Sequence, residues 1–296
     1  MYGFAGINVA ASRFDMNMVD FKSNALLLSD AMAVWDVICP GTHAPQSADE
    51  TTDKTHIVFP YDGLYVHHVG HDQAIADSSR VLFLNTDQVW RMSHPVAGGD
   101  SSLSIGLNPE VLVELVPGEL LASGDTAALN RCALRLDART QALAASVRHR
   151  LDRGAIGGVL EAETVTMGLI SAALQGYAPD ERRITARSRK LADAAKLVVG
   201  ADLGRRWTLS EIAAELGVSP VYLTQVFQRV EAIPMYRYQL QLRLAQALQR
   251  LGEYDDVTDL AFDLGFSSHS HFTAAFKQTY GQTPSDFRRS SGVRRR

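Results

Sequence analysis

Hydrophobic and polar residues alternate along roughly the first hundred positions of this chain, and turn-forming residues interrupt the alternation often. A period of two is the spacing of a strand with one buried face. The alternation predicts strands at 56–59, 64–69, 80–84, 88–93 and 102–107, with turns at 60–63 and 85–87. Short strands joined by turns favour a small β sandwich or barrel up to about residue 108.

The pattern changes to helical spacing at Pro109. Ala, Leu and Arg recur every three or four residues in 129–151 and 159–174, which predicts two amphipathic helices that pack on the sheet domain or on a second subunit. The segment 177–188 follows Gly176, contains Pro179 and is rich in arginine, which is typical of a solvated linker. We therefore predict one domain at 1–176 and another at 189–296.

The C-terminal part contains two degenerate copies of one pattern, at 209–227 and 257–276. Each copy reads as a helix, a glycine turn and a second helix, which is a helix-turn-helix. Gly217 and Gly265 stand where the chain must turn with positive φ, and Ser219 and Ser268 are suited to cap the helices that follow. Two such units predict a protein that reads DNA, whereas the structural alternative is a pair of helical packing units that never touch DNA.

A long helix predicted at 235–251 separates the two copies. Seventeen helical residues span about 25 Å. With this spacer, the second helices of both copies can enter successive major-groove segments, which lie about 34 Å apart. One subunit would then contact two turns of DNA.

Charge is distributed unevenly along the 296 residues. From Ala186 onwards there are 16 Lys and Arg against 11 Asp and Glu, a net charge of +5, which leaves −9 for the rest of a chain whose total is −4. A basic C-terminal part beside an acidic N-terminal part suits a DNA-binding domain joined to one that touches no phosphate. No apolar run approaches the roughly 18 residues of a membrane span, so we expect a cytoplasmic protein without membrane contacts.

The segment 265–289, GFSSHSHFTAAFKQTYGQTPSDFRR, resembles the C-terminal signature of the AraC/XylS family of transcriptional regulators. The similarity extends upstream through 210–227 and the spacer residues Arg243, Leu244 and Ala247, about a hundred residues in all. The resemblance implies an α+β two-domain protein, with an N-terminal cupin-like β-barrel with flanking helices and a C-terminal all-α double helix-turn-helix. It also implies an N-terminal domain that binds an effector or dimerises, and a DNA-binding domain at promoters where RNA polymerase is recruited.

Two positions depart from the family pattern. Residues 231–233 replace a loop that usually holds a glycine, and Ala274 stands where the family often has arginine. The second change removes one contact to a base or a phosphate. We therefore expect the first copy to carry more of the sequence specificity.

Helix geometry separates the outward, DNA-facing positions of each second helix from the positions that pack inward. Inward positions are Leu223, Val226 and Phe227 in the first copy, and Phe272 and Phe276 in the second. The predicted DNA-binding residues are Val221, Tyr222, Thr224, Gln225, Gln228 and Arg229, then His269, Ser270, His271, Thr273 and Lys277, with Arg205 and Arg206 ahead of the first copy. Thr224 and Gln225 are the best base readers, because glutamine can bond adenine bidentately and threonine offers a methyl or hydroxyl group.

The N-terminal part carries no recognisable site. His67 and His68 are adjacent on a predicted strand and so face opposite sides of it, and no His-x-His pattern with a downstream Glu and His is present. We expect no metal site and no cofactor, and we interpret Cys39 and Cys132 as reduced structural thiols. Trp35 and Trp90, with neighbouring tyrosines, line either an apolar effector pocket or the core.

The alternatives are an enzyme, for which no phosphate-binding loop, zinc-protease or nucleophile-elbow motif is present, and a ligand-free DNA-binding protein whose N-terminal barrel only dimerises. We interpret the chain as a transcription activator, not an enzyme, that binds double-stranded promoter DNA and responds to a small-molecule effector or partner, with a homodimer as a further possibility.

Overall fold

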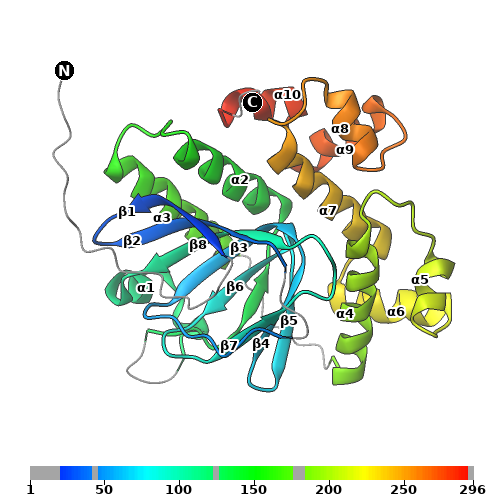
Figure 1. The fold of residues 1–296 in the computed structure, drawn as a ribbon, viewed down its shortest axis with the longest axis horizontal. Coiled ribbons are helices and arrows are strands. Elements are labelled where there is room, and N and C mark those ends of the chain that lie inside the picture. Colours follow the sequence, from blue (N-terminus) through cyan, green and yellow to red (C-terminus); the bar gives the residue numbers. More distant parts are fainter. Residues whose placement is uncertain (1–20, 42–45, 123–126, 176–183, 293–296) are drawn as a thin grey trace.

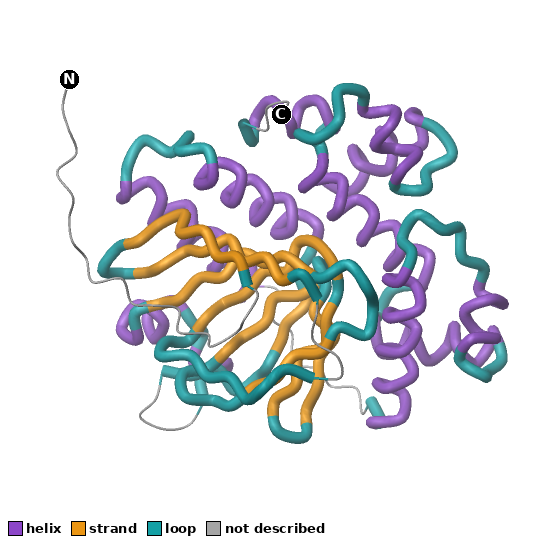
Figure 2. The backbone as a smooth tube through the Cα atoms, viewed as in Figure 1, coloured by secondary structure: helices purple, strands orange, loops and turns teal. Residues whose placement is uncertain are grey.

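The computed structural model describes residues 21–41, 46–122, 127–175 and 184–292. Its strands all fall in the N-terminal part, and the C-terminal part is helical, as Figure 2 shows. This confirms the division into a sheet-containing part and an all-α part. The predicted linker 177–188 lies largely outside the described residues, so the domain boundaries stay predictions.

The described strands form two sheets. One has six strands in the order β1-β2-β8-β3-β6-β9 and the other has three in the order β5-β4-β7, and neighbouring strands in both sheets are antiparallel. Hydrogen bonds between these described strands do not join the sheets into one closed barrel. The strands are β1 Lys22–Leu28, β2 Met32–Cys39, β3 His56–Gly63, β4 Tyr65–Val69, β5 Asp72–Ala76, β6 Arg80–Leu84, β7 Trp90–Ser93, β8 Asp100–Leu107 and β9 Ala133–Arg135.

Side chains alternate across the larger sheet and fill two layers. Ile57 and Phe83 belong to the apolar layer beneath the helices, whereas Val58 and Leu82, their neighbours in sequence, pack with Trp90 of the smaller sheet. Figure 1 shows α2 and α3 beside the larger sheet. The helices of this part are α1 Pro109–Leu115, a short 3₁₀ turn η1 Gly118–Leu120, α2 Ala138–Asp152 and α3 Val159–Gln175.

Several sequence predictions for this part need correction. The predicted turn at 60–63 is instead the end of β3, which continues through an irregularity between Pro60 and Asp62. The predicted helix at 129–151 begins only at Ala138, because Ala133–Arg135 pairs with β6. Strands β1, β2 and β5 were not predicted.

The C-terminal helices are α4 Ala186–Ala201, α5 Leu209–Glu215, α6 Pro220–Glu231, α7 Met235–Arg250, α8 Val257–Asp263, α9 His269–Tyr280 and α10 Pro284–Ser290. Both predicted helix-turn-helix units are therefore present, as α5–α6 and α8–α9, and α7 is the predicted spacer. Helix α10, capped by Thr283, was not predicted. Each unit has its own core, built around Phe227 in the first and Phe276 in the second.

The two parts of the chain pack directly on one another. Helix α2 contacts α7 and α9, and α7 contacts β3. Ala145 of α2 lies in the same apolar cluster as Leu248 of α7 and Phe272 of α9. The sheet-containing part therefore contacts the spacer helix α7 and the second unit's helix α9. Figure 1 shows the close approach of α2 and α7.

Candidate nucleic-acid interface

The first helix-turn-helix is built by local capping and a glycine turn. Thr208 and Glu211 form a capping box at the start of α5: the Thr208 hydroxyl accepts from the Glu211 amide, and the Glu211 carboxylate accepts from the Thr208 amide. The Thr208 hydroxyl and the Thr208 amide both donate to the Glu211 carboxylate, and with the Arg205 guanidinium they lower the pKa of Glu211 to about 2. Gly217 turns with φ of 63°, and the Ser219 hydroxyl accepts from the Tyr222 amide to open α6. The roles predicted for Gly217 and Ser219 are confirmed.

Helix α6 presents a polar face to solvent. Leu223, Val226 and Phe227 are buried, as predicted. Of the outward positions, Thr224 is half-buried and its hydroxyl donates to the Pro220 carbonyl over 2.9 Å. The other outward positions are exposed: Val221, Tyr222, Gln225, Gln228 and Arg229.

Helix α9 repeats this arrangement in the second unit. Ser268 accepts from the His271 amide at its start, and Gly265 turns with φ of 77°. Phe272 and Phe276 are fully buried. The predicted outward residues His269, Ser270, His271 and Lys277 are exposed, and Thr273 is half-buried. Ala274 is also exposed, so the position where the family often has arginine does face solvent.

Two arginines precede α5. Arg205 lies 4.0 Å above the Trp207 ring and pairs with Glu211 over 2.8 Å, while Arg206 is exposed. Exposed pairs of this kind contribute little to stability. Both guanidinium groups therefore remain accessible beside the first unit.

Arg243 of α7 joins the two units. Its guanidinium donates to the Leu203 carbonyl over 2.6 Å, to the Arg205 carbonyl over 2.8 Å and to the Gly265 carbonyl over 3.2 Å. One side chain thus satisfies backbone groups before α5 and in the turn between α8 and α9. This fixes the second unit's turn relative to the first unit.

A buried ion cluster holds the end of α6 against the sheet-containing part, and sequence reasoning missed it. Glu231 is the last residue of α6, and its side chain is 4% exposed. Its carboxylate lies 2.6 Å from Lys196 of α4, 3.1 Å from Arg80 of β6 and 2.9 Å from Arg135 of β9. Burial would raise the pKa of Glu231, but these three cations lower it to about 2.

Arg135 of β9 also caps the C-terminal end of α6. Its guanidinium donates to the carbonyl oxygens of Val230 and Glu231, two of the groups that a helix leaves unpaired at its C-terminus. Nearby, the buried Tyr238 hydroxyl of α7 donates to Asp77 over 2.8 Å. The sheet-containing part therefore holds the end of α6 and the start of α7 by hydrogen bonds and ion pairs.

A second set of contacts joins α2 to the later part of α7. His149 is hydrogen-bonded to the Leu248 carbonyl over 3.0 Å, and burial lowers the pKa of His149 to about 4. Arg148 donates to Gln249 over 3.1 Å and pairs with Asp36 of β2 over 3.1 Å. A small pocket opens at this seam between β3, α2 and α7, with Phe59, Tyr61, Leu103, Arg148, Leu248 and Gln249 among its lining residues.

The turn between α6 and α7 shows how the chain replaces the usual glycine. Ala232 adopts φ of 54°, the left-handed conformation that Gly281 provides at the corresponding end of α9. A residue with a Cβ is disfavoured there by roughly 1–2 kcal/mol. Ala232 thus takes a glycine-type conformation at a cost in stability.

A family model described as a helix-turn-helix domain matches residues 212–290, which run from α5 to α10. The match covers the C-terminal helices and shows that this part of the chain is a helix-turn-helix domain, as its resemblance to AraC/XylS-type regulators predicted. Among the described residues, no helix has both the length and the apolar character needed to cross a membrane.

Curated bacterial regulators also match part of the chain. The HTH-type transcriptional regulator GlxA of Rhizobium meliloti is 35% identical over 77 residues, 26% of this chain and 24% of the relative. The regulatory protein PocR of Salmonella typhimurium is 30% identical over 91 residues, 30% of each chain. The chain thus spans less than a third of the length of either curated relative.

Among solved structures, a transcriptional regulator from Chromobacterium violaceum, titled as an AraC-type DNA-binding domain-containing protein, is 26% identical and covers 36% of this chain and 96% of its own, with a TM-score of 0.34.

Proposed function

We propose that this AraC-type chain is a sequence-specific DNA-binding regulator that places α6 and α9 in successive major-groove segments of promoter DNA. The observation that carries the proposal is the exposure of both outward helix faces while the N-terminal part packs on other surfaces of the same helices. The core residues of α6 and α9 anchor them, and Arg243 ties their units together. A double-stranded DNA partner follows from this arrangement.

Within α6, we assign base reading to Thr224 and Gln225. The Thr224 hydroxyl hydrogen is engaged by the Pro220 carbonyl, so its methyl group is the part offered to a thymine methyl. Gln225 is exposed and free to pair with an adenine edge. Arg206 and Arg229 supply phosphate contacts, and Arg205 joins them by leaving its exposed pair with Glu211. The remaining predicted positions on α6 and α9 complete the interface.

For the N-terminal part, we propose a cupin-like regulatory and dimerisation domain at 1–176 that acts on the DNA-binding domain at 189–296. The small pocket at the seam of β3, α2 and α7 is lined by residues of both parts, so a ligand that widened and entered it would touch both parts at once. A ligand that fits one packing of α2 on α7 better than another would shift the orientation of the helix-turn-helix units. Activation by recruiting RNA polymerase, in the cytoplasm, completes this proposal.

The alternative is a ligand-free protein whose N-terminal part only dimerises. The two proposals differ in one measurement, the melting temperature of the full-length protein in the presence of candidate metabolites. An effector that binds the folded state raises the melting temperature with its concentration. If the N-terminal part serves only for dimerisation, the melting temperature depends on the protein concentration and does not change with any metabolite.

Selection of genomic fragments by the purified full-length protein tests the DNA-binding proposal. At about 150 mM salt, nonspecific phosphate binding is weakened and specific sites are retained. We expect enriched fragments to share two sequence boxes about one helical turn apart. The absence of any enriched sequence, both with and without added cell extract, would rule out sequence-specific binding.

A further inference from the structure

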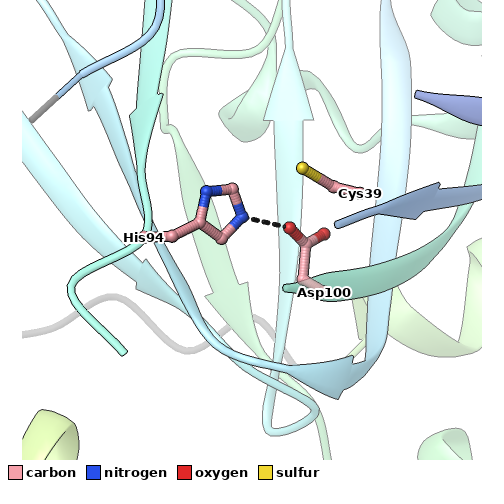
Figure 3. Close-up of side chains that lie close together, drawn as sticks. All are labelled: Cys39, His94 and Asp100. Atoms are coloured by element: carbon pink, nitrogen blue, oxygen red, sulfur yellow. Dashed lines mark hydrogen bonds and ion pairs between the residues drawn. The ribbon is translucent and has the colours of Figure 1, made fainter. Parts of the chain in front are cut away.

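Three side chains with different metal-binding atoms meet in the buried interior between the two sheets. The Cys39 sulfur, a His94 ring nitrogen and an Asp100 carboxylate oxygen all lie within 4.8 Å of one another. All three residues are buried, and the His94 side chain is fully so. In Figure 3 the His94 ring points at the Asp100 carboxylate, with the Cys39 sulfur close above it.

The sheet register fixes two members of this cluster. Cys39 ends β2 and Asp100 begins β8, and the two residues are directly paired across the antiparallel ladder. Directly paired residues place their side chains on the same face of a sheet. His94 follows β7 of the opposite sheet, and its Nε2 lies 2.5 Å from Asp100 Oδ1. The cluster therefore bridges the two sheets.

Glycines allow the backbone to close around these residues. Gly99 has φ of 71°, and a Cβ there would lie 2.1 Å from the Cys39 carbonyl oxygen. Gly63, with φ of 72°, stands opposite Asp100 at the end of β3, where a Cβ would lie 2.1 Å from the Gly99 carbonyl oxygen. The ends of β2 and β3 can approach the start of β8 this closely only because these positions lack side chains. The Tyr65 ring, 6.0 Å from the His94 ring between centroids, covers another side.

We propose that Cys39, His94 and Asp100 form a binding site for one zinc-class divalent cation. Thiolate sulfur, imidazole nitrogen and carboxylate oxygen are the donor atoms that zinc takes in proteins. A thiolate, a carboxylate and a neutral imidazole together carry two negative charges, which balance a buried dication.

Ligand atoms that share a zinc ion lie roughly 3.5 Å apart, so small side-chain rotations within the cluster accommodate the ion. Three protein ligands leave one coordination position open. Because Cys39 and Asp100 belong to the larger sheet and His94 follows β7 of the smaller one, the ion would link the two sheets.

Cobalt(II) binding to the metal-depleted, full-length protein tests this proposal, because cobalt replaces zinc at such sites and a thiolate ligand gives it a near-ultraviolet charge-transfer band. We expect one equivalent of cobalt per chain, a thiolate band, and loss of the band when zinc is added in excess. Cys39→Ser should abolish the band, and His94→Gln should weaken cobalt binding by at least tenfold, in line with the loss of a ligand. Cys132→Ser, which changes the other cysteine, should leave both unchanged.

Circular dichroism establishes that each variant is folded before it is compared. No cobalt uptake by the wild-type protein would overturn the proposal. It would equally be overturned by uptake without a thiolate band, which is the behaviour of exposed histidines, or by a band that survives Cys39→Ser and disappears with Cys132→Ser. If Cys39→Ser fails to fold, the cobalt affinity of His94→Gln decides, and an unchanged affinity counts against the site.

Discussion

Replacing Glu231 by glutamine removes a carboxylate that pairs with all three cations of the buried cluster. Glu231→Gln keeps the shape of the side chain but leaves Lys196, whose side chain is fully buried, paired with Asp193 at 3.8 Å. Breaking a buried ion pair on one side costs about 3–5 kcal/mol, because the remaining charge is uncompensated. Arg135 is 42% exposed and can regain water. We therefore expect a loss at the lower end, about 3 kcal/mol.

Urea unfolding of the full-length protein, followed by tryptophan fluorescence, measures this loss. Asp49→Asn is the matched control, because Asp49 pairs with Arg91 at an exposed surface, and its midpoint should stay that of the wild type. A double variant, Lys196→Met with Glu231→Gln, should be more stable than Glu231→Gln alone, since it removes the stranded charge. The reasoning is refuted if Glu231→Gln behaves like Asp49→Asn, or if the double variant loses the sum of both single effects.

The depressed pKa of Glu231 also sets a pH window. The carboxyl group has a pKa of about 2 when folded against an ordinary value of 4.5, so its contribution is present above pH 4.5 and is lost as the pH falls towards 2. In that interval the unfolding free energy of Glu231→Gln should fall less steeply with pH than that of the wild type. Parallel curves would mean that Glu231 titrates alike in both states.

Three further predictions follow from single positions. Ala232→Gly should raise the unfolding free energy by about 0.5–1 kcal/mol, because glycine adopts positive φ without the steric cost of a Cβ. Gly281→Ala should lower the unfolding free energy by about 1 kcal/mol for the same reason, and changes of the same sign in urea unfolding would contradict this. Gln225→Ala should reduce discrimination at one base position by about 1–3 kcal/mol, whereas Arg229→Ala should lower the affinity for all DNA sites alike. Equilibrium binding to single-base variants of the site measures both effects, and the reverse pattern would contradict the assignment. Burial depresses the pKa of His149 to about 4 from 6.5, so the contribution of neutral His149 to the free energy of unfolding is present above pH 6.5 and is lost as the pH falls to 4. The unfolding free energy of His149→Gln should therefore lack up to about 3 kcal/mol of this pH dependence, and a pH profile identical to that of the wild type would show that His149 is not responsible.

The N-terminal strands were predicted only where one local pattern was enough. Strands β4, β6 and β7 fall close to the predicted ones because alternation and flanking turn residues are visible within a few positions. Strand β9 was taken for helix, because Leu and Arg in 129–137 also fit helical spacing and only the hydrogen bonds to β6 decide otherwise. His67 and His68 did behave as their adjacency predicted: His67 is buried, and His68 is bonded to Ser93 near the surface.

By itself, the sequence determined the double helix-turn-helix, its capping residues Ser219 and Ser268, and which residues of α6 and α9 face inward. Periodicity, glycine turns and caps act within about twenty residues, so the information lies in contiguous sequence. The tertiary structure alone decided that Arg80 would meet Glu231, 151 residues away, and that Cys39 and Asp100 would face His94. These long-range contacts depend on strand register and on the packing of one part of the chain against the other, and no local sequence pattern encodes either of them.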